Sequence, residues 1–379
     1  MKKQLNLIKV LVPPSLRYEL RETAAFLREQ LGRACLWRWK IVKFKLRNDS
    51  SFNILYVGRK NNLEKAKALL AANRDLESNP IGKGGAEQMA LVCDMPFPGA
   101  LCVPFLLSSI IPLHRSIEEI TANFHSQLRR DLRKYLTSYR LQQVLDSDEI
   151  ERIDREMLRP YAIARHGIGA SQIDPDEVKR VAQKYGRFDL LLLGDDVVGC
   201  QLEHEYSRGE KRFWTSMRCG YPEPVFSDPK RFRDSNAINI HLALKWAVEN
   251  GFDYYDMGVA MGRPGDGLLE WKRRRGGELD TMGNSTYLHI RLPGEGAAQF
   301  LWDAPLFSVE RHKLSLHLGL PDGPNDEEIA THYREMGYRG LYKVCLHCAR
   351  RPGEQLLETL HSLYADQKYP PILEIISST

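Results

Sequence analysis

Between residues 136 and 292 the hydrophobic positions change period in a regular order. Alternating apolar positions predict strands, and apolar positions three or four residues apart predict helices. The predicted strands are 139–144, 188–193, 197–206, 211–221, 252–259 and 285–292, and the predicted helices are 148–165, 174–185, 236–250 and 268–275. Turns of hairpin length join the three middle strands, so these strands form antiparallel pairs. A purely parallel nucleotide-binding sheet is therefore excluded, and no G-x-G-x-x-G follows the first strand.

The flanking segments carry weaker patterns. Residues 1–16 are interpreted as a first strand or arm, 79–85 as a loop, and 100–112 as buried strand or loop, because prolines interrupt its apolar run. After 292 the pattern predicts helices at 327–336 and 352–366 and strands at 341–348 and 372–376. We expect an N-terminal α/β domain at 1–115, a catalytic domain at 116–292 and a C-terminal α/β extension at 293–379. The extension is expected to complete the N-terminal sheet.

A capping box marks the start of the central domain. Ser116 and Glu119 stand three residues apart ahead of an apolar stripe, which predicts one amphipathic helix as far as Tyr135. Its opposite face carries Arg129, Arg130, Arg133 and Lys134. The sequence therefore predicts a connector helix with a basic outer side.

Composition restricts the class of protein. A chain of 379 residues is long enough for two domains, and 43% hydrophobic with 27% charged residues is typical of a globular protein. No run reaches the roughly 18 apolar residues of a membrane span, so we expect a cytoplasmic protein with no membrane insertion. The seven cysteines are scattered, and only Cys345 and Cys348 are close in sequence. Neither a disulfide framework nor a metal site is expected.

Charge is modest overall but clustered. The net charge is +5, and the clusters are Arg129, Arg130, Arg133 and Lys134; Lys230, Arg231 and Arg233; and Lys272 to Arg275. Such clusters predict a phosphate-bearing partner: CoA, tRNA or a nucleotide-linked precursor. The alternative is three separate solvated patches.

The stretch from Ser235 to Leu279 carries the candidate chemistry. A helix ends at Gly251, a strand reaches Asp256-Met257-Gly258, a glycine-rich loop follows, and Trp271-Lys272 precedes Gly276-Gly277. This order resembles the last third of the catalytic domain of FemAB-like transferases, which belong to the GNAT acyltransferase superfamily. The resemblance implies a mixed α/β, GNAT-like fold. It also implies two tandem GNAT-like domains if residues 1–115 are a degenerate copy.

The same resemblance suggests roles for individual residues. Lys272 would stabilise the charge that develops at the acyl-transfer centre, and Trp271 replaces the usual phenylalanine beside the donor channel. Asp256 would hold the following loop or orient the amine. Gly265, Gly267 and Tyr254 are expected to line the donor site. The alternative for Lys272 is a surface lysine in the basic run WKRRR.

The general base is assigned from strand alternation alone. Gln201, Glu203 and Glu205 share one face of the predicted strand, and Glu203 is central enough to take a proton. A solvated carboxylate at a sheet edge is the alternative. His204, among apolar neighbours, is interpreted as a core histidine.

The phosphate loop of acetyl-CoA enzymes is missing. The segment between 218 and 236 has a single glycine, Gly220, and cannot form a backbone cradle for a pyrophosphate. Lys230, Arg231 and Arg233, with Arg129 and Arg130, are the expected donor-binding cations instead.

These observations predict an N-acyltransferase that forms an amide on a small-molecule or peptide amine. An acyl-CoA or acyl carrier protein thioester is the favoured donor, because no heptad pattern predicts the coiled-coil arm common in tRNA-dependent FemAB proteins. Aminoacyl-tRNA is the alternative donor. A non-catalytic binding or scaffold protein on a GNAT fold is the second alternative, and it would tolerate loss of Lys272.

Overall fold

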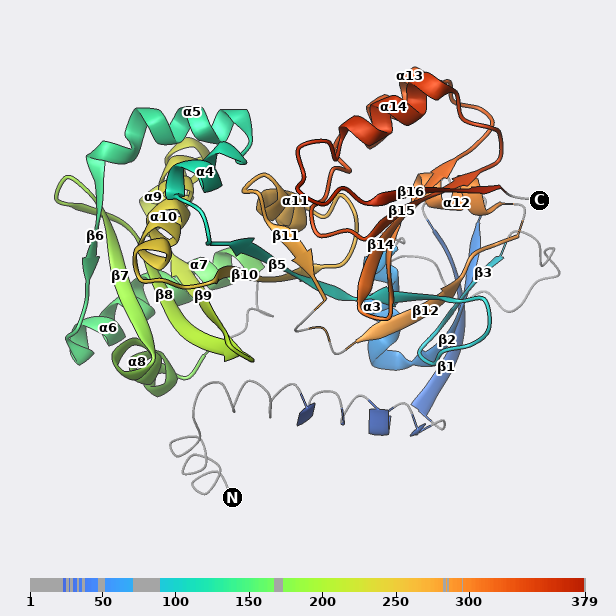
Figure 1. Ribbon diagram of the computed structural model, residues 1–379. Helices are drawn as coiled ribbons and strands as arrows, with labels where there is room; N and C mark the ends of the chain where they lie inside the picture. Colours follow the sequence, from blue (N-terminus) through green and yellow to red (C-terminus); the bar gives the residue numbers. More distant parts are fainter. Residues whose placement is uncertain are drawn as a thin grey trace. The chain divides into compact units, whose positions relative to one another are not determined.

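The computed structural model describes residues 38–46, 52–70, 89–166, 173–281, 284, 286–294 and 296–377, with a few positions between 23 and 35. The predicted N-terminal arm at 1–16 and the loop at 79–85 lie outside the described residues. The chain forms two compact units (Figure 1). The first contains residues 110–258 and 274–277, and the second contains the described parts of 21–109, 259–273 and 278–379. The domains expected from the sequence are each one continuous stretch of chain, whereas each of the two units is made of several separate stretches.

The first unit is built from one sheet and the helices that cover it. Its elements are α4 (Ile117–Ala122), α5 (Ser126–Tyr135), β6 (Tyr139–Gln143), α6 (Ser147–Ile153), α7 (Arg159–His166), α8 (Pro175–Lys184), β7 (Gly186–Leu193), β8 (Asp196–Arg208), β9 (Lys211–Gly220), α9 (Glu223–Phe226), α10 (Pro229–Glu249) and β10 (Tyr254–Met261). A π-helical turn, Asp154–Leu158, joins α6 to α7.

Strand order confirms the predicted mixed α/β, GNAT-like arrangement of this unit. Strands β6, β7, β8 and β9 pair antiparallel in sequence, and β10 joins β9 in parallel after the crossover through α10. Gly194 forms the tight turn between β7 and β8 with φ +61°, and Gly251 follows α10 with φ +69°. Both turns require the left-handed conformation that glycine adopts without steric cost.

The two faces of this sheet differ in chemistry. Phe188, Leu190 and Leu202 belong to an apolar core shared with α6 and α8. The alternate positions Asp189 and Gln201 are just as buried but polar, as is Glu203, and α10 packs against β8. Apolar burial therefore holds one helical layer on the sheet, whereas polar groups are enclosed on the alternate face.

Two predicted helices in this unit differ from the observed ones. The helix expected from Ser116 to Tyr135 keeps its capping box but breaks after α4, and α5 restarts where the His125 ring nitrogen accepts from the Gln127 amide. The helix expected to begin at Ser235 begins at Pro229 instead. There the Asp228 carboxylate accepts from the amides of Lys230 and Arg231. A proline that follows an aspartate cap starts a helix six residues before the apolar pattern becomes visible.

The second unit contains two further sheets. Its elements are β1 (Trp39–Lys45), β2 (Asn53–Arg59), α3 (Lys60–Leu69), β3 (Met89–Cys93), β4 (Leu101–Pro104), α11 (Gly267–Arg273), β11 (Glu278–Asp280), β12 (Tyr287–Arg291), α12 (Ala297–Asp303), β13 (Leu306–Glu310), β14 (Lys313–Leu320), α13 (Asp326–Tyr333), β15 (Lys343–Cys348), α14 (Glu354–Ser362) and β16 (Ile372–Ser377). Strand β5 (Leu106–Pro112) and β10 continue along the chain from one unit into the other.

The C-terminal strands do not enter the N-terminal sheet. The order there is β1-β2-β3-β12-β4, so β12 is the strand that completes it, whereas β13-β14-β15-β16 form a sheet of their own. The expected completion by the extension is therefore wrong in its strands. The extension still shares a core with the N-terminal strands, because Phe300, Leu301 and Leu306 pack with Ile54 and Leu288.

Close backbone approach between β14 and α12 depends on Gly319. A Cβ at this position would lie 1.8 Å from the carbonyl oxygen of Ala298. We expect Gly319→Ala to lower the free energy of unfolding by about 2 kcal/mol, because the strand and the helix must separate. Chemical denaturation measures this loss. Gly323→Ala is the control, since nothing lies within 4 Å of a Cβ there, and equal stability of the two variants would contradict the prediction.

Candidate active site

The predicted site residues fall in both units, and each group is described within its own unit. Glu203, Asp256, Tyr254 and the basic residues of α5 and α10 belong to the first unit. Lys272, Trp271, Gly265 and Gly267 belong to the second.

The pairing of β9 with β10 ends in the middle of both strands. Three parallel pairs join them, from Tyr254 with Phe213 to Asp256 with Thr215. Beyond that point β9 continues to Gly220, still paired with β8, while β10 continues toward Met261. The β8–β9 register also shifts here, because Glu203 opposes Ser216 and Leu202 opposes Arg218. Met217 is therefore the extra residue of a β-bulge, a device that re-aims a strand where pairing ends.

Glu203 lies buried beside this point with a donor on each carboxylate oxygen. The Tyr255 hydroxyl donates to Oε1 at 2.6 Å, and the Trp214 indole N–H donates to Oε2 at 2.9 Å. The side chain is 1% exposed, so the predicted alternative of a solvated edge carboxylate is wrong. Burial raises the pKa of Glu203 to about 7, although both hydrogen bonds oppose the rise.

Asp256 ends the paired part of β10 and holds the loop that follows. Its Oδ1 accepts from the Gly258 amide at 2.8 Å, and its Oδ2 accepts from the Tyr206 hydroxyl at 2.8 Å. Its own carbonyl accepts from the Thr215 hydroxyl of β9. Gly258 has φ +74°, so the chain turns at a residue that tolerates it. The carboxylate thus fixes the position where β10 leaves β9.

These contacts limit what the two carboxylates can do chemically. Neither is a solvent-exposed base, because both are buried and each oxygen already accepts a hydrogen bond. With a pKa near neutrality, however, Glu203 can hold or release a proton next to the Tyr255 hydroxyl. Its two hydrogen bonds also orient the Tyr255 hydroxyl and the Trp214 indole.

Cations from two helices of the first unit gather on one surface. Helix α5 packs against α10, and the Lys134 ammonium is close enough to Asp234 to interact with it electrostatically. Burial raises the pKa of the Tyr139 hydroxyl, and the nearby Arg231 guanidinium opposes that rise. We call this the basic surface; its residues are Arg129, Arg130, Arg133, Lys134, Lys230, Arg231 and Arg233.

Most of the basic surface is not neutralised. Arg233 pairs with Asp234 at 3.5 Å, and within the described ranges no carboxylate forms an ion pair with the other six side chains. All seven except Arg231 are exposed. The two clusters that the sequence placed far apart in the chain are therefore parts of one surface.

In the second unit, Lys272 is carried by a helix that the C-terminal extension anchors. Lys272 is 2% exposed, so the alternative of a surface lysine is wrong. Helix α11 is fixed through Glu270, whose carboxylate accepts from Tyr338 and from Arg273. The Tyr338 hydroxyl also accepts from the Gly265 amide at 2.8 Å, and Arg273 reaches Glu335. The extension thus positions the loop and helix on which Lys272 sits.

Sequence patterns did not single out the partners of these residues. Tyr255, Trp214, Tyr206 and Tyr338 are aromatic residues in strands or loops, and such residues are usually core. The one available signal was that tyrosine and tryptophan need a hydrogen-bond partner when buried. That signal does not say which carboxylate the partner is.

The described ranges contain no group of three or more His, Cys, Asp or Glu side chains arranged to hold a metal ion. Among the helices in these ranges, none has the length and apolar character needed to cross a bilayer.

Comparison with known proteins gives structural similarity only. No protein-family model matches the chain, and no curated protein matches it. The C-terminal domain of a putative lysylphosphatidylglycerol synthetase from Agrobacterium fabrum is 13% identical over 76% of this chain and 94% of that chain, with a TM-score of 0.34. FemX is 13% identical over 69% of this chain and 90% of its own chain, with a TM-score of 0.38. L-PGS from Bacillus licheniformis is 13% identical over 72% of this chain and 91% of its own chain, with a TM-score of 0.35.

The raised pKa of Glu203 predicts a pH-dependent stability. The ordinary pKa of a glutamate is 4.5, and that of Glu203 in the folded protein is about 7. At pH values between these two, the folded state keeps the proton that the unfolded state has lost, so the free energy of unfolding falls as pH rises. Glu203→Gln has no carboxyl group to ionise, so we expect it to lack this loss. Between pH 4.5 and pH 8 its free energy of unfolding should rise by about 3 kcal/mol relative to that of the wild type.

Urea denaturation at the two pH values measures this difference. Glu210→Gln, at an exposed turn of the same hairpin, is the control and should follow the wild type. Parallel behaviour of Glu203→Gln and the wild type would show that Glu203 ionises normally.

Proposed function

We propose that this protein transfers an aminoacyl or other acyl group to an amine acceptor and forms an amide. The observation that carries this proposal is the end of pairing between β9 and β10 beside Glu203 and Tyr255. Both strands continue past Thr215 and Asp256 without pairing to each other. Two parallel strands that separate in this way present backbone N–H and C=O groups to an extended ligand.

A donor acyl chain fits this opening by chemistry. The β9 backbone from Ser216 to Gly220 pairs with β8 on one side, and an extended acyl or aminoacyl group would take up hydrogen bonds on the other. Arg218 fixes this half of β9 by donating to Asp154 at 3.1 Å and to the Leu158 carbonyl at 3.3 Å. The strand is therefore rigid where it would receive the donor.

The basic surface shifts the preferred donor from a thioester to aminoacyl-tRNA. Seven cations spread over two helices offer more phosphate contacts than one CoA needs. Repeated phosphates are what a polynucleotide presents, and side-chain cations bind them without any backbone cradle. A thioester donor remains the second candidate.

The proposed reaction needs no group outside the donor and the acceptor. The acceptor nitrogen attacks the carbonyl carbon of the aminoacyl ester, and the new C–N bond forms as the bond to the ribose oxygen breaks. The proton lost by nitrogen goes to the departing oxygen. The resemblance assigns Lys272 to the developing negative charge on the carbonyl oxygen. Asp256 and Glu203 position β10 and Tyr255.

Removing the charge of Lys272 tests the catalytic proposal. Lys272→Met keeps most of the buried stem, and we expect about 100-fold slower amide formation, the scale at which loss of one oxyanion donor is felt. The assay follows release of deacylated tRNA, or of free thiol from acyl-CoA, in the presence of a panel of amines. Arg274→Met, an exposed position in the same basic run, is the control. Wild-type rates in a folded Lys272→Met variant, or no turnover with any donor, would favour the binding-protein alternative.

Salt dependence tests the donor. Removing one cation that binds a phosphate is expected to reduce the slope of log affinity against log salt by about 0.7 to 0.9. We therefore expect Arg129→Gln/Arg130→Gln to weaken tRNA binding and to flatten this slope, as measured by fluorescence anisotropy with charged and uncharged tRNA.

The matched control for this measurement is Arg152→Gln/Arg155→Gln. These are exposed arginines that already pair with glutamates, so they should leave the slope unchanged. Equal slopes for the two double variants would exclude the basic surface as the site that binds tRNA.

A further inference from the structure

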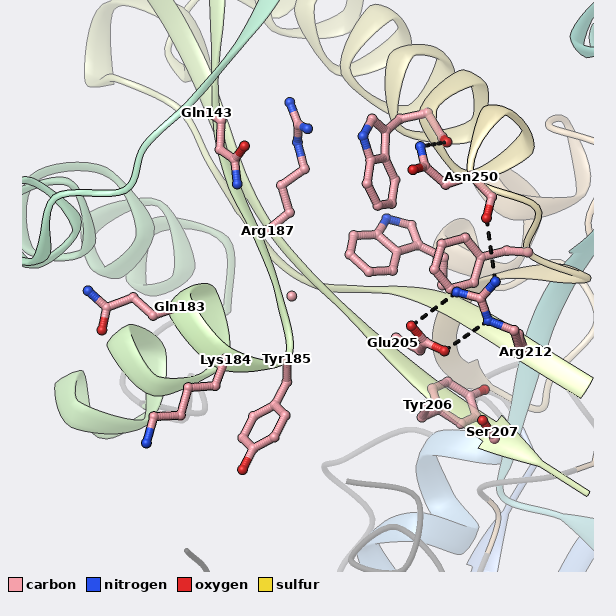
Figure 2. A pocket seen from close by; sticks show the side chains of 14 residues that line it. Gln143, Gln183, Lys184, Tyr185, Arg187, Glu205, Tyr206, Ser207, Arg212 and Asn250 are labelled. Carbon is pink, nitrogen blue, oxygen red and sulfur yellow. Dashed lines mark hydrogen bonds and ion pairs between the residues drawn. The ribbon is translucent and has the colours of Figure 1, made fainter. Parts of the chain in front are cut away.

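A pocket lies in the first unit, away from the point where β9 and β10 separate. It has a volume of about 610 Å³ and is lined where α8 and α10 end and where β7 and β9 begin (Figure 2). This volume is within the range of small-molecule sites. No residue predicted from the sequence to carry chemistry lines it.

One residue that lines the pocket, Gly186, has no side chain. Gly186 begins β7, and a Cβ there would lie 1.9 Å from the carbonyl oxygen of Glu203 in β8. The two strands therefore approach each other more closely than any other residue would allow. Gly186 therefore brings the edge of the pocket next to the backbone of Glu203.

One wall of the pocket is aromatic. The rings of Trp214 and Trp246 have centroids 4.5 Å apart, and Phe252 lies 5.1 Å from Trp214. Trp214 and Phe252 are buried, whereas Trp246 is only half-buried. A planar apolar ring can therefore gain contact area on Trp246 at modest ordering cost, because the wall is already packed.

The charges of the pocket decide which ligand suits this wall. The Arg187 guanidinium lies 5.3 Å from the centre of the Trp246 ring, and that of Arg212 lies 4.3 Å from the centre of Phe252. The positions over the rings where a cationic ligand would sit are thus taken by the protein's own cations. The Glu205 carboxylate accepts two hydrogen bonds from Arg212, at 3.0 and 3.2 Å. It is therefore not available to a cationic ligand.

Positive charge is left for an anion on the opposite side. Lys184 lies across the pocket from the Glu205–Arg212 pair in Figure 2 and is exposed, and among the described residues no carboxylate forms an ion pair with it. Arg187 pairs with the buried Asp189, which fixes its side chain while leaving other N–H groups of the guanidinium able to donate. Amides of Gln143, Gln183 and Asn250 also line the pocket.

We infer that this pocket binds a small planar anion: an aromatic or heteroaromatic ring that bears a carboxylate or a phosphate. The ring lies against the part of Trp246 that the Arg187 guanidinium leaves uncovered, and Arg187 and Lys184 attract the anionic group from two sides of the pocket. The site is separate from the proposed acyl-transfer centre and does not depend on it. Because Trp214 touches both this pocket and Glu203, its indole N–H reports on ligand binding.

Three kinds of probe separate the ring from the charge. Indole-3-carboxylate and adenosine monophosphate carry both, indole and adenosine carry the ring alone, and acetate and inorganic phosphate carry the charge alone. Nitrogen-15 NMR of the six tryptophan indoles measures binding. We expect a ring with an anion to shift Trp214 and Trp246 but not Trp302 of the second unit, and to bind about tenfold more tightly than either part alone, a difference of about 1.4 kcal/mol.

The carboxylate and phosphate probes identify the source of the anion. Tighter binding of indole-3-carboxylate points to an aromatic acid, and tighter binding of adenosine monophosphate points to a nucleotide. Either result supports the site. If neither anionic probe binds more tightly than its neutral counterpart, indole or adenosine, or if the shifts spread over all the indoles, the inference is overturned.

The pH dependence of the Trp214 indole resonance is a second readout. Its midpoint reports the ionisation of Glu203, which a pocket with no bound anion would leave unchanged. The groups that act on Glu203 are Tyr255 and Trp214, which donate to it, together with Asp189, Arg187 and Cys219. The positive charge of Arg187 favours the ionised form of Glu203, and a bound anion offsets that charge. Saturating ligand is therefore expected to raise the midpoint of the Glu203 titration above about 7. An unchanged midpoint at saturation would place the probe outside the pocket and overturn the inference.

Substitutions test the two halves of the site. Lys184→Gln is expected to weaken binding of the anionic rings about tenfold and to leave the neutral rings unaffected, whereas Trp246→Leu weakens both. Lys245→Gln, an exposed lysine beside Trp246 on the same helix, is the matched control and should bind like the wild type. If Lys184→Gln and Lys245→Gln bind alike, the anion is not held where the structure assigns it.

Discussion

A buried carboxylate must find hydrogen-bond donors, and in the first unit this requirement links three strands. Glu203 on β8 takes one donor from Trp214 on β9 and another from Tyr255 on β10. A buried carboxylate left without these donors would cost several kcal/mol. Asp256 makes the same kind of link one residue further along, through Tyr206 and the Gly258 amide. The separation of β9 from β10 therefore starts at a place that is held firmly.

The polar residues on this face also lie next to the residues that line the pocket. The alternate face of β7 and β8 is apolar and packs on α6 and α8. Here Asp189, Gln201 and Glu203 are enclosed, and the aromatic rings of Trp214 and Trp246 close the end nearest the pocket. Glu203 cannot rearrange freely among these rings, because breaking either of its hydrogen bonds would leave a buried group unsatisfied. Trp214 therefore connects the pocket directly to Glu203.

The second unit shows the same principle on a short helix. Seven residues are too few for α11 to be stable alone. Burial of Leu269 and the hydrogen bonds among Glu270, Arg273 and Tyr338 hold it in place. The position of Lys272 is consequently set by residues that follow it by more than sixty positions.

Local periodicity and backbone preferences were enough to predict the element order of the first unit, the hairpin turns between its middle strands, the helix end at Gly251 and the capping box at Ser116. The sequence also singled out Glu203 as a central position by alternation. It did not determine that Glu203 is buried, that β12 enters the N-terminal sheet, or that α5 and α10 share one basic surface. Those features depend on contacts between residues far apart in the chain. Only the tertiary structure decides which buried donors meet which carboxylate, because periodicity specifies a face and not the partner that covers it.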